Sequence, residues 1–246
     1  MSPGFDAAVV AEEISAELEA LGTPARAESE RAYLKSDLVF YGTSVPNMRT
    51  VVKRFLRAHP GLTHDELIDV CVALWGPPGV DAIHENRAAA VLLLDERPKL
   101  LSIDDVPTIE RLIRESKTWA YVDTLAAHVA ARLAAVDQEM LGVLDRWVAD
   151  DDFWIRRSAV LALGDLLRDG RELGRFFRYA DLLLPEKEFF IRKVLGWVAR
   201  ETGRRYPNDV SAWLRRNQAQ MNGVTIREAV KYLPDGEELL ELWKNR

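Results

Sequence analysis

The chain has 246 residues, of which 48% are hydrophobic and 29% charged, and its formal net charge at pH 7 is −6. This length permits one large domain or two small ones with a sizeable core, and we predict one domain over residues 1–246. The negative charge argues against a general polyanion binder. A lone cysteine excludes a disulfide framework, and the sequence has no run of about 18 apolar residues. We also expect no signal peptide, and therefore a soluble cytoplasmic protein.

Apolar residues recur at helical spacing along the chain, and no segment shows the alternation typical of a strand. Short breaks rich in Gly, Pro, Asp and Asn separate the helical segments, and Ser44 and Thr63 occupy expected N-cap positions. The sequence therefore predicts an all-α protein. The predicted helices cover residues 5–21, 28–36, 46–57, 64–75, 83–95, 104–115, 118–134, 137–149, 152–168, 171–183, 187–204, 206–217, 225–232 and 235–244.

The second half of the chain suggests helical repeats. From about residue 104 the predicted helices form pairs of roughly 34 to 36 residues, although self-similarity alone does not establish a repeat. The acidic turn at 149–157 resembles the inter-helix turn of HEAT-type repeats. Because such helices cannot bury their apolar faces alone, we predict a superhelical array of HEAT-like antiparallel pairs with a binding site on its concave face.

Positive charge is concentrated in one part of the chain. Residues 153–216 contain fourteen basic and eight acidic side chains, a net charge of +6, so the remainder carries −12. This asymmetry is compatible with one basic face on an acidic body.

The predicted helix 187–204 places a tryptophan among basic side chains. At 100° per residue its apolar positions fall on one face, and the other face carries Lys193, Trp197, Arg200 and Arg204. An indole beside three cations suits an anionic, aromatic partner such as nucleic acid. The alternative is that Trp197 packs against a neighbouring helix and the cations are solvated.

In the predicted helix 118–134, Trp119 and Asp123 are four residues apart and therefore neighbours on the helix surface. They lie beside the predicted core positions, and the small residues Ala127 and Ala130 continue the same strip, which leaves room for a partner. The alternative is that Asp123 pairs with an arginine of the next helix and that Trp119 is a core residue.

Arg157 follows an acidic turn and lies among apolar neighbours. A guanidinium in such surroundings needs an anionic partner, because an unpaired buried charge is costly. Asp123 and a phosphate are both candidates. The alternative is the purely structural inward arginine that is frequent in HEAT-type repeats.

The sequence lacks the patterns of a metal site, a phosphate-binding glycine loop or a serine or cysteine nucleophile. The histidines share no ligand spacing with Cys71, and we expect all four to be surface or capping residues: His59, His64, His84 and His128. An enzyme built from this chain would work with carboxylates, arginines and aromatic rings.

Five motifs occur in order along the chain. They are Phe40-Tyr41-Gly42-x-x-x-Pro46-x-x-Arg49, Lys117-x-Trp119-x-x-Val122-Asp123, Asp152-x-Trp154-x-x-Arg157, the block 187–201, and Arg227-Glu228-Ala229-x-Lys231. Together they resemble the AlkD-like DNA alkylation repair family over about residues 30–234, and the block 187–201 is the most specific part. Thr50 departs from the family pattern, which often has a second basic residue there.

The resemblance implies a DNA glycosylase that hydrolyses the N-glycosidic bond of positively charged N3- and N7-alkylated purines in duplex DNA. Carried over by motif, Asp123 is the catalytic carboxylate, Trp119 and Trp197 lie beside the lesion, and Arg157 contacts the phosphate backbone. Further backbone contacts are assigned to Lys193, Arg49 and Arg200.

From these assignments we expect no metal, no organic cofactor, no membrane partner and a monomer associated with the nucleoid. The rival interpretation is a non-catalytic HEAT-repeat scaffold that binds DNA or another protein, because fold resemblance does not guarantee activity. The presence of Asp123 favours the enzyme, since binding to phosphate gains nothing from a carboxylate at that position.

Overall fold

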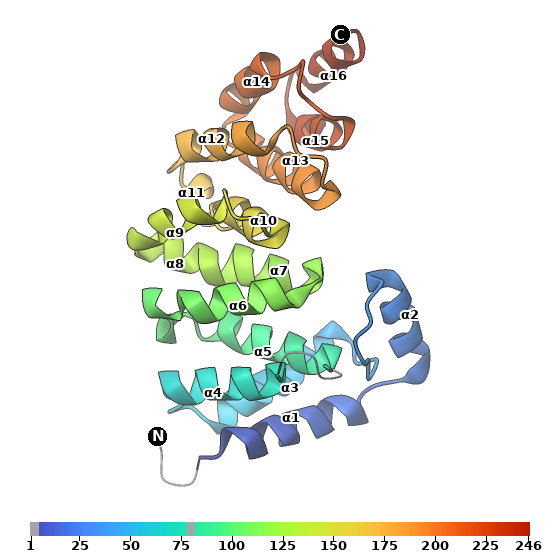
Figure 1. The fold of residues 1–246 in the computed structure, drawn as a ribbon, viewed down its shortest axis with the longest axis vertical. Helices are drawn as coiled ribbons and strands as arrows, with labels where there is room; N and C mark the ends of the chain where they lie inside the picture. Colours follow the sequence, from blue (N-terminus) through green and yellow to red (C-terminus); the bar gives the residue numbers. More distant parts are fainter. Residues whose placement is uncertain (1–4, 78–81) are drawn as a thin grey trace. The chain divides into compact units, whose positions relative to one another are not determined.

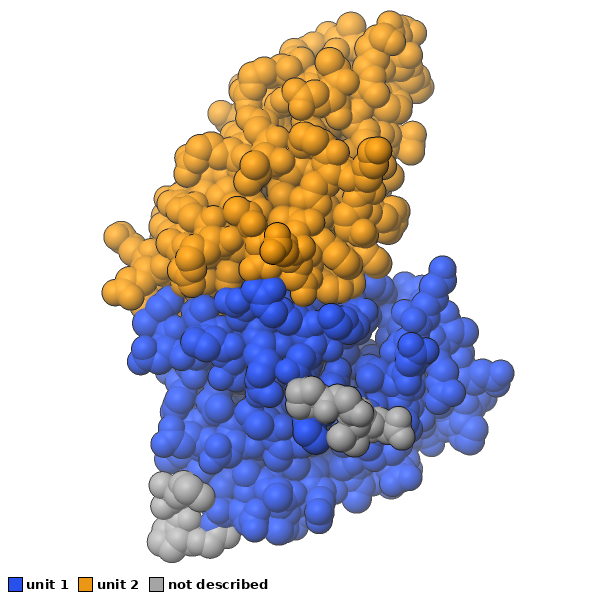
Figure 2. All heavy atoms as spheres, in the orientation of Figure 1, with its two compact units in different colours: residues 1–125 blue, residues 126–246 orange. Residues whose placement is uncertain are grey.

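The computed structural model describes residues 5–77 and 82–246. The chain divides into two compact units, Met1–Leu125 and Ala126–Arg246 (Figure 2). Throughout the described ranges the regular elements are helices, and the β-structure amounts to one isolated bridge between Val39 and Ile83. The predicted all-α fold of repeated helices is thereby confirmed, whereas the assignment of the whole chain to one domain stays a prediction.

In the first unit, α5 is the helix that most of the others contact. It packs against α1, α3, α4 and α7, and α4 also packs against α1. Figure 1 shows α2 standing to one side of these layers, and α2 has no buried residue. The helices are α1 (Ala7–Ala20), α2 (Pro24–Leu34), α3 (Val45–Ala58), α4 (His64–Trp75), α5 (His84–Glu96), α6 (Val106–Ser116) and α7 (Trp119–Thr124), with 3-10 turns at Pro98–Leu100 and Ile103–Asp105.

In the second unit, α13 is the central helix. It packs against α10, α11, α14 and α15. The helices are α8 (Ala131–Val136), α9 (Glu139–Trp147), α10 (Phe153–Leu161), α11 (Gly164–Arg168), α12 (Leu173–Leu183), α13 (Phe189–Gly203), α14 (Pro207–Arg216), α15 (Gly223–Ala229) and α16 (Gly236–Lys244), with a 3-10 turn at Val230–Tyr232.

The predicted helix caps are present. The Thr63 hydroxyl accepts a hydrogen bond from the Glu66 backbone N–H at 3.3 Å, and the Glu66 carboxylate accepts one from the Thr63 backbone N–H at 3.0 Å. Ser44 caps α3 through the backbone N–H of Asn47 at 3.3 Å. The predicted start of α2 at residue 28 was wrong, because Pro24 occupies the first turn of this helix instead of ending a break.

Two long predicted helices are interrupted. A π-helix, Leu125–Ala130, joins α7 to α8, and a turn at 162–163 separates α10 from α11. Both interruptions lie in segments that are mostly apolar, where hydrophobic periodicity does not distinguish one helix from two. The expected open strip is also only partly correct, because Ala127 is half-buried whereas Ala130 is completely buried.

His64, at the start of α4, joins two helix N-termini in the first unit. Its Nδ1 lies 2.8 Å from an oxygen of Asp65, and its Nε2 lies 2.8 Å from an oxygen of Asp105. Asp105 also accepts a hydrogen bond from the Ser102 backbone N–H at 2.8 Å, so the contact joins α4 to the turn before α6. These hydrogen bonds raise the pKa of His64 above its ordinary value of 6.5, against the lowering effect of burial.

Because the pKa of His64 is raised in the folded state, its charged form stabilises the fold below about pH 6.5, and this stabilisation is lost as the pH rises through the raised value. His64→Ala should therefore lower the free energy of unfolding more at pH 5.5 than at pH 8.5. The difference should be below about 1 kcal/mol, because the ring is 42% exposed. Urea unfolding at both pH values measures it, and equal losses would contradict the assignment.

Candidate functional site

Trp119 and Asp123 lie on a short helix that follows a sharp turn. After α6, Lys117 adopts the left-handed conformation with φ of 50°, and Thr118 is extended. The Thr118 side chain then caps α7 by accepting a hydrogen bond from the Ala120 backbone N–H at 3.3 Å. Trp119 is the first residue of α7, and Asp123 follows one turn later. Both side chains are half-buried, so they border the surface.

A buried hydrogen bond fixes α7 on α5. The Tyr121 hydroxyl lies 2.5 Å from Nδ1 of His84 and 3.2 Å from its backbone oxygen, and its ring meets that of Trp75 edge-on at 5.7 Å. Burial lowers the pKa of His84, against the opposing charge of Glu85, and burial raises the pKa of Tyr121. The pair is therefore uncharged near neutral pH. The prediction of His84 as a surface or capping residue was wrong, because its side chain is buried and bonds to Tyr121 of α7.

The first motif of the sequence supports this histidine. The Phe40 ring stacks on His84 with centroids 4.6 Å apart. Gly42 has a φ of 81°, which favours glycine, and its backbone N–H donates to the buried carboxylate of Glu85 at 2.7 Å. The backbone N–H groups of Tyr41 and Thr43 donate to the same carboxylate. This motif therefore orders the neighbourhood of α7.

Two side chains from other helices border α7. Tyr33 of α2 is 72% exposed, and its ring meets that of Trp119 edge-on with centroids 5.9 Å apart. Tyr33 was not among the predicted site residues, although an aromatic residue in a polar helix was an available signal. Arg49 of α3 is half-buried and lines a small cavity of about 100 Å³ together with Ala120 and Thr124 of α7.

The seven tryptophans separate into two classes. Four are buried in the cores: Trp75, Trp147, Trp154 and Trp213. Trp119, Trp197 and Trp243 are half-buried. The Trp243 N–H donates to the Met221 carbonyl at 2.8 Å, whereas the indole N–H groups of Trp119 and Trp197 have no hydrogen-bond acceptor among the described residues. The two tryptophans expected beside a ligand are thus accessible and retain a donor.

In the second unit, Arg157 lies beneath Trp197. Its Cζ is 6.0 Å from the centroid of the Trp197 ring and 5.9 Å from that of Phe190, and it donates to the Phe190 carbonyl at 2.7 Å. Arg157 is only 3% exposed. Its contact to a DNA phosphate stays a prediction, and its observed contacts stabilise the position of the indole.

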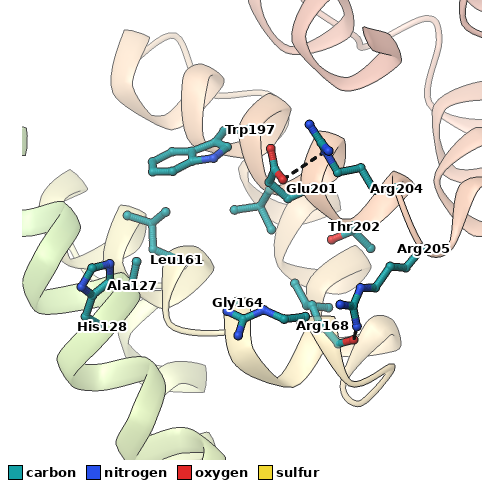
Figure 3. A pocket seen from close by; sticks show the side chains of 12 residues that line it. Ala127, His128, Leu161, Gly164, Arg168, Trp197, Glu201, Thr202, Arg204 and Arg205 are labelled. Carbon is teal, nitrogen blue, oxygen red and sulfur yellow. Dashed lines mark hydrogen bonds and ion pairs between the residues drawn. The ribbon is translucent and has the colours of Figure 1, made fainter. Parts of the chain in front are cut away.

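A pocket of about 420 Å³ opens beside Trp197 (Figure 3). Its apolar floor comes from α10, α11 and α13, and all of its residues belong to the second unit. The side chains around this floor include Ala127, His128, Arg168, Trp197, Arg204 and Arg205. Trp197 and Arg204 were predicted on one surface, but Arg168, which α11 brings to the pocket, and Arg205, which lies just after α13, were not predicted there.

The two basic residues predicted on α13 differ in their surroundings. Lys193 is exposed, and no acidic group of the described chain lies within ion-pair distance of it. Arg200 is half-buried and pairs with Glu228 and with Glu201, the latter at 2.8 Å. Burial would raise the pKa of Glu228, but the hydrogen bond from Lys231 and the nearby charges lower it below its ordinary value. A phosphate at Arg200 would have to compete with two carboxylates, and its role stays a prediction.

Each unit therefore brings together part of the predicted set. Trp119 and Asp123 are neighbours in the first unit, and Arg157 and Trp197 are neighbours in the second. A single site that combines both pairs stays a prediction. The described residues hold no cluster of three or more metal-ligating side chains, and the absence of a metal cofactor also stays a prediction.

The sequence profile of the DNA alkylation repair enzyme family matches residues 14–233. The chain belongs to this family. Membership identifies DNA as the partner and alkylation repair as the process. None of the helices in the described ranges combines the length and apolar composition of a membrane span.

Two solved structures share the family fold. A predicted DNA alkylation repair enzyme from Enterococcus faecalis is 20% identical, with a TM-score of 0.77 over 87% of this chain and 97% of the other. Smu.31 from Streptococcus mutans UA159 is 15% identical, with a TM-score of 0.57 over 76% of this chain and 99% of the other. A comparison with curated proteins found no match.

In the second unit, close packing at Gly196 positions α13, the helix that carries Trp197. A Cβ at Gly196 would lie 2.7 Å from Cβ of Glu228 and 2.9 Å from the Thr225 carbonyl oxygen, so α13 and α15 approach each other only because this residue lacks a side chain. The Thr225 hydroxyl donates to the Arg192 carbonyl at 2.9 Å in the same contact.

Gly196→Ala should lower the free energy of unfolding by about 1 to 3 kcal/mol, because the added methyl group overpacks this contact. Gly142→Ala, in α9, is the matched control, since nothing lies within 4 Å of its added Cβ. The control should be neutral or stabilise by up to about 1 kcal/mol. Urea unfolding of the two variants tests the assignment, and equal effects would contradict it.

Proposed function

We propose that this protein is a DNA glycosylase that excises positively charged N3- and N7-alkylated purines from duplex DNA. The observation that carries the proposal is the placement of Trp119 and Asp123 one turn apart at the accessible start of a buried, rigidly held helix. Family membership supports the substrate class, because this family repairs alkylated DNA.

The residue types suit hydrolysis of the N-glycosidic bond. Alkylation gives the purine a positive charge, so the base leaves with the electron pair of the broken bond. Positive charge then develops on the sugar, as in the oxocarbenium-like transition state of glycoside hydrolysis. The Asp123 carboxylate stabilises that charge and orients the water that adds at the anomeric carbon. Water supplies the new oxygen and loses one proton.

The aromatic residues contribute through their faces. An indole attracts a cationic base or sugar, typically by about 1 to 2 kcal/mol when the contact is desolvated. Trp119 supplies such a surface next to Asp123, and Tyr33 extends it. In the second unit Trp197 has the same role, and Arg157 beneath it keeps the ring in place. Lys193 and Arg49 supply charge for the phosphate backbone.

Asp123→Asn should reduce excision of alkylated purines by about 100- to 1000-fold, which corresponds to about 3 to 4 kcal/mol of lost transition-state stabilisation. The fold and the affinity for duplex DNA should persist. The measurement is release of free base from methylated duplex DNA under single-turnover conditions, without added metal.

Asp69→Asn is the matched control for this variant, because it removes an exposed carboxylate of α4 in the same unit. It changes the net charge equally and should leave excision unchanged. Normal excision by Asp123→Asn would refute the proposed role of Asp123. Binding of DNA without excision by the unaltered protein would favour the non-catalytic DNA-binding interpretation.

Trp119→Ala and Trp197→Ala should each slow excision by about 5- to 30-fold, a smaller loss than that of the Asp123 variant. Trp243→Ala is the control, because this half-buried indole is engaged with Met221 and Arg246. It should leave excision unchanged. An equal loss in all three variants would indicate destabilisation instead of contact with the lesion.

A further inference from the structure

The pocket beside Trp197 has two chemically different sides. Figure 3 shows Trp197, Ala127 and His128 on one side, and Arg168 and Arg205 on the other. With a volume of about 420 Å³ the pocket falls within the range of sites for small ligands. A ligand that fits both sides must carry a flat or apolar portion next to an anionic group.

The three arginines of the pocket differ in how much of their charge is neutralised. Arg204 pairs with Glu201 at 3.3 Å and stacks on the Tyr232 ring, with its Cζ 3.9 Å from the centroid. Arg168 pairs with Asp165 at 2.6 Å, although its side chain is 60% exposed. Arg205 is exposed and has no acidic ion-pair partner in the described ranges. The unneutralised charge of the pocket therefore lies mainly at Arg205.

Arg205 also has a structural contact. One of its N–H groups donates to the Arg168 carbonyl at 2.7 Å, where α11 ends. This bond uses only one of the donors of the guanidinium, and it fixes the Arg205 side chain at the end of α11. The remaining donors are available to a phosphate, which guanidinium groups bind through parallel hydrogen bonds.

We propose that this pocket binds one sugar–phosphate unit of the DNA backbone. The phosphate lies on Arg205 and Arg168, and the deoxyribose lies against the Trp197 indole. The proposal rests on the proposed function for the identity of the ligand as DNA. In this proposal the main contact of the second unit to the DNA backbone is made by Arg205 and Arg168. Arg200, which was predicted for that contact, is paired with two carboxylates.

The test is the salt dependence of binding to an undamaged DNA duplex, measured by fluorescence anisotropy over a range of KCl concentrations. Arg205→Gln should lower the slope of log K against log salt by about 0.9, the loss of one phosphate contact. Binding near 0.1 M salt should weaken by about 5- to 10-fold. Arg168→Gln should act in the same direction, and Arg205→Lys should retain the slope because it retains the charge.

Arg178→Gln is the matched control. Arg178 is an exposed arginine of α12 in the same unit, outside the pocket and without an ion pair among the described residues. It should leave the slope unchanged. If Arg205→Gln lowers thermal stability but leaves the slope unchanged, Arg205 only caps α11 and the proposal fails. An equal change of slope in the Arg178 variant would also overturn it.

This measurement separates the two proposals. Excision by the unaltered protein together with an unchanged slope for Arg205→Gln would overturn the pocket assignment alone. A reduced slope without excision by the unaltered protein would support the pocket assignment and refute the glycosylase.

Discussion

The hydrogen bond between Tyr121 and His84 is the contact on which the candidate site of the first unit depends. α7 is short, and a helix of its length has little stability of its own. Burial of Tyr121 and its bond to a neutral imidazole fix the rotation of the helix about its axis. The rotation decides which residues reach the surface, and here these are Trp119 and Asp123. The position of the half-buried Asp123 carboxylate thus depends on the buried side chain of Tyr121, two residues earlier.

The second unit applies the same principle to Trp197. Its ring lies above the buried guanidinium of Arg157, and its helix is held against α15 through Gly196. In both units a half-buried aromatic side chain stands on a helix whose opposite face is closely packed. Rigid support of this kind limits the rearrangement that binding would require. The block 187–201 therefore contains both a residue that packs the helix, Gly196, and a residue predicted to contact the ligand, Trp197.

Ion pairing limits how much of the basic composition can attract DNA. Arg200 and Arg204 share Glu201, and Arg200 also contacts Glu228. Their charge is largely neutralised before any ligand arrives. Lys193 and Arg205 have no such partner among the described residues, so each contributes more to the local positive potential than a paired arginine does. This explains how a chain with a net charge of −6 can present cationic positions to a polyanion.

The sequence by itself determined the helical class, most helix boundaries, and the adjacency of Trp119 and Asp123, because all three depend on local spacing. Its ordered motifs also indicated the family, which the profile match confirmed. The interruption at Leu125–Ala130 was not predictable, because an apolar run has the same periodicity on either side of a π-turn. The burial of His84, the pairing of Arg200 and the meeting of Arg168 with Arg205 were decided only by the tertiary structure. Each of these depends on which distant segment packs against the residue, and local spacing carries no information about that partner.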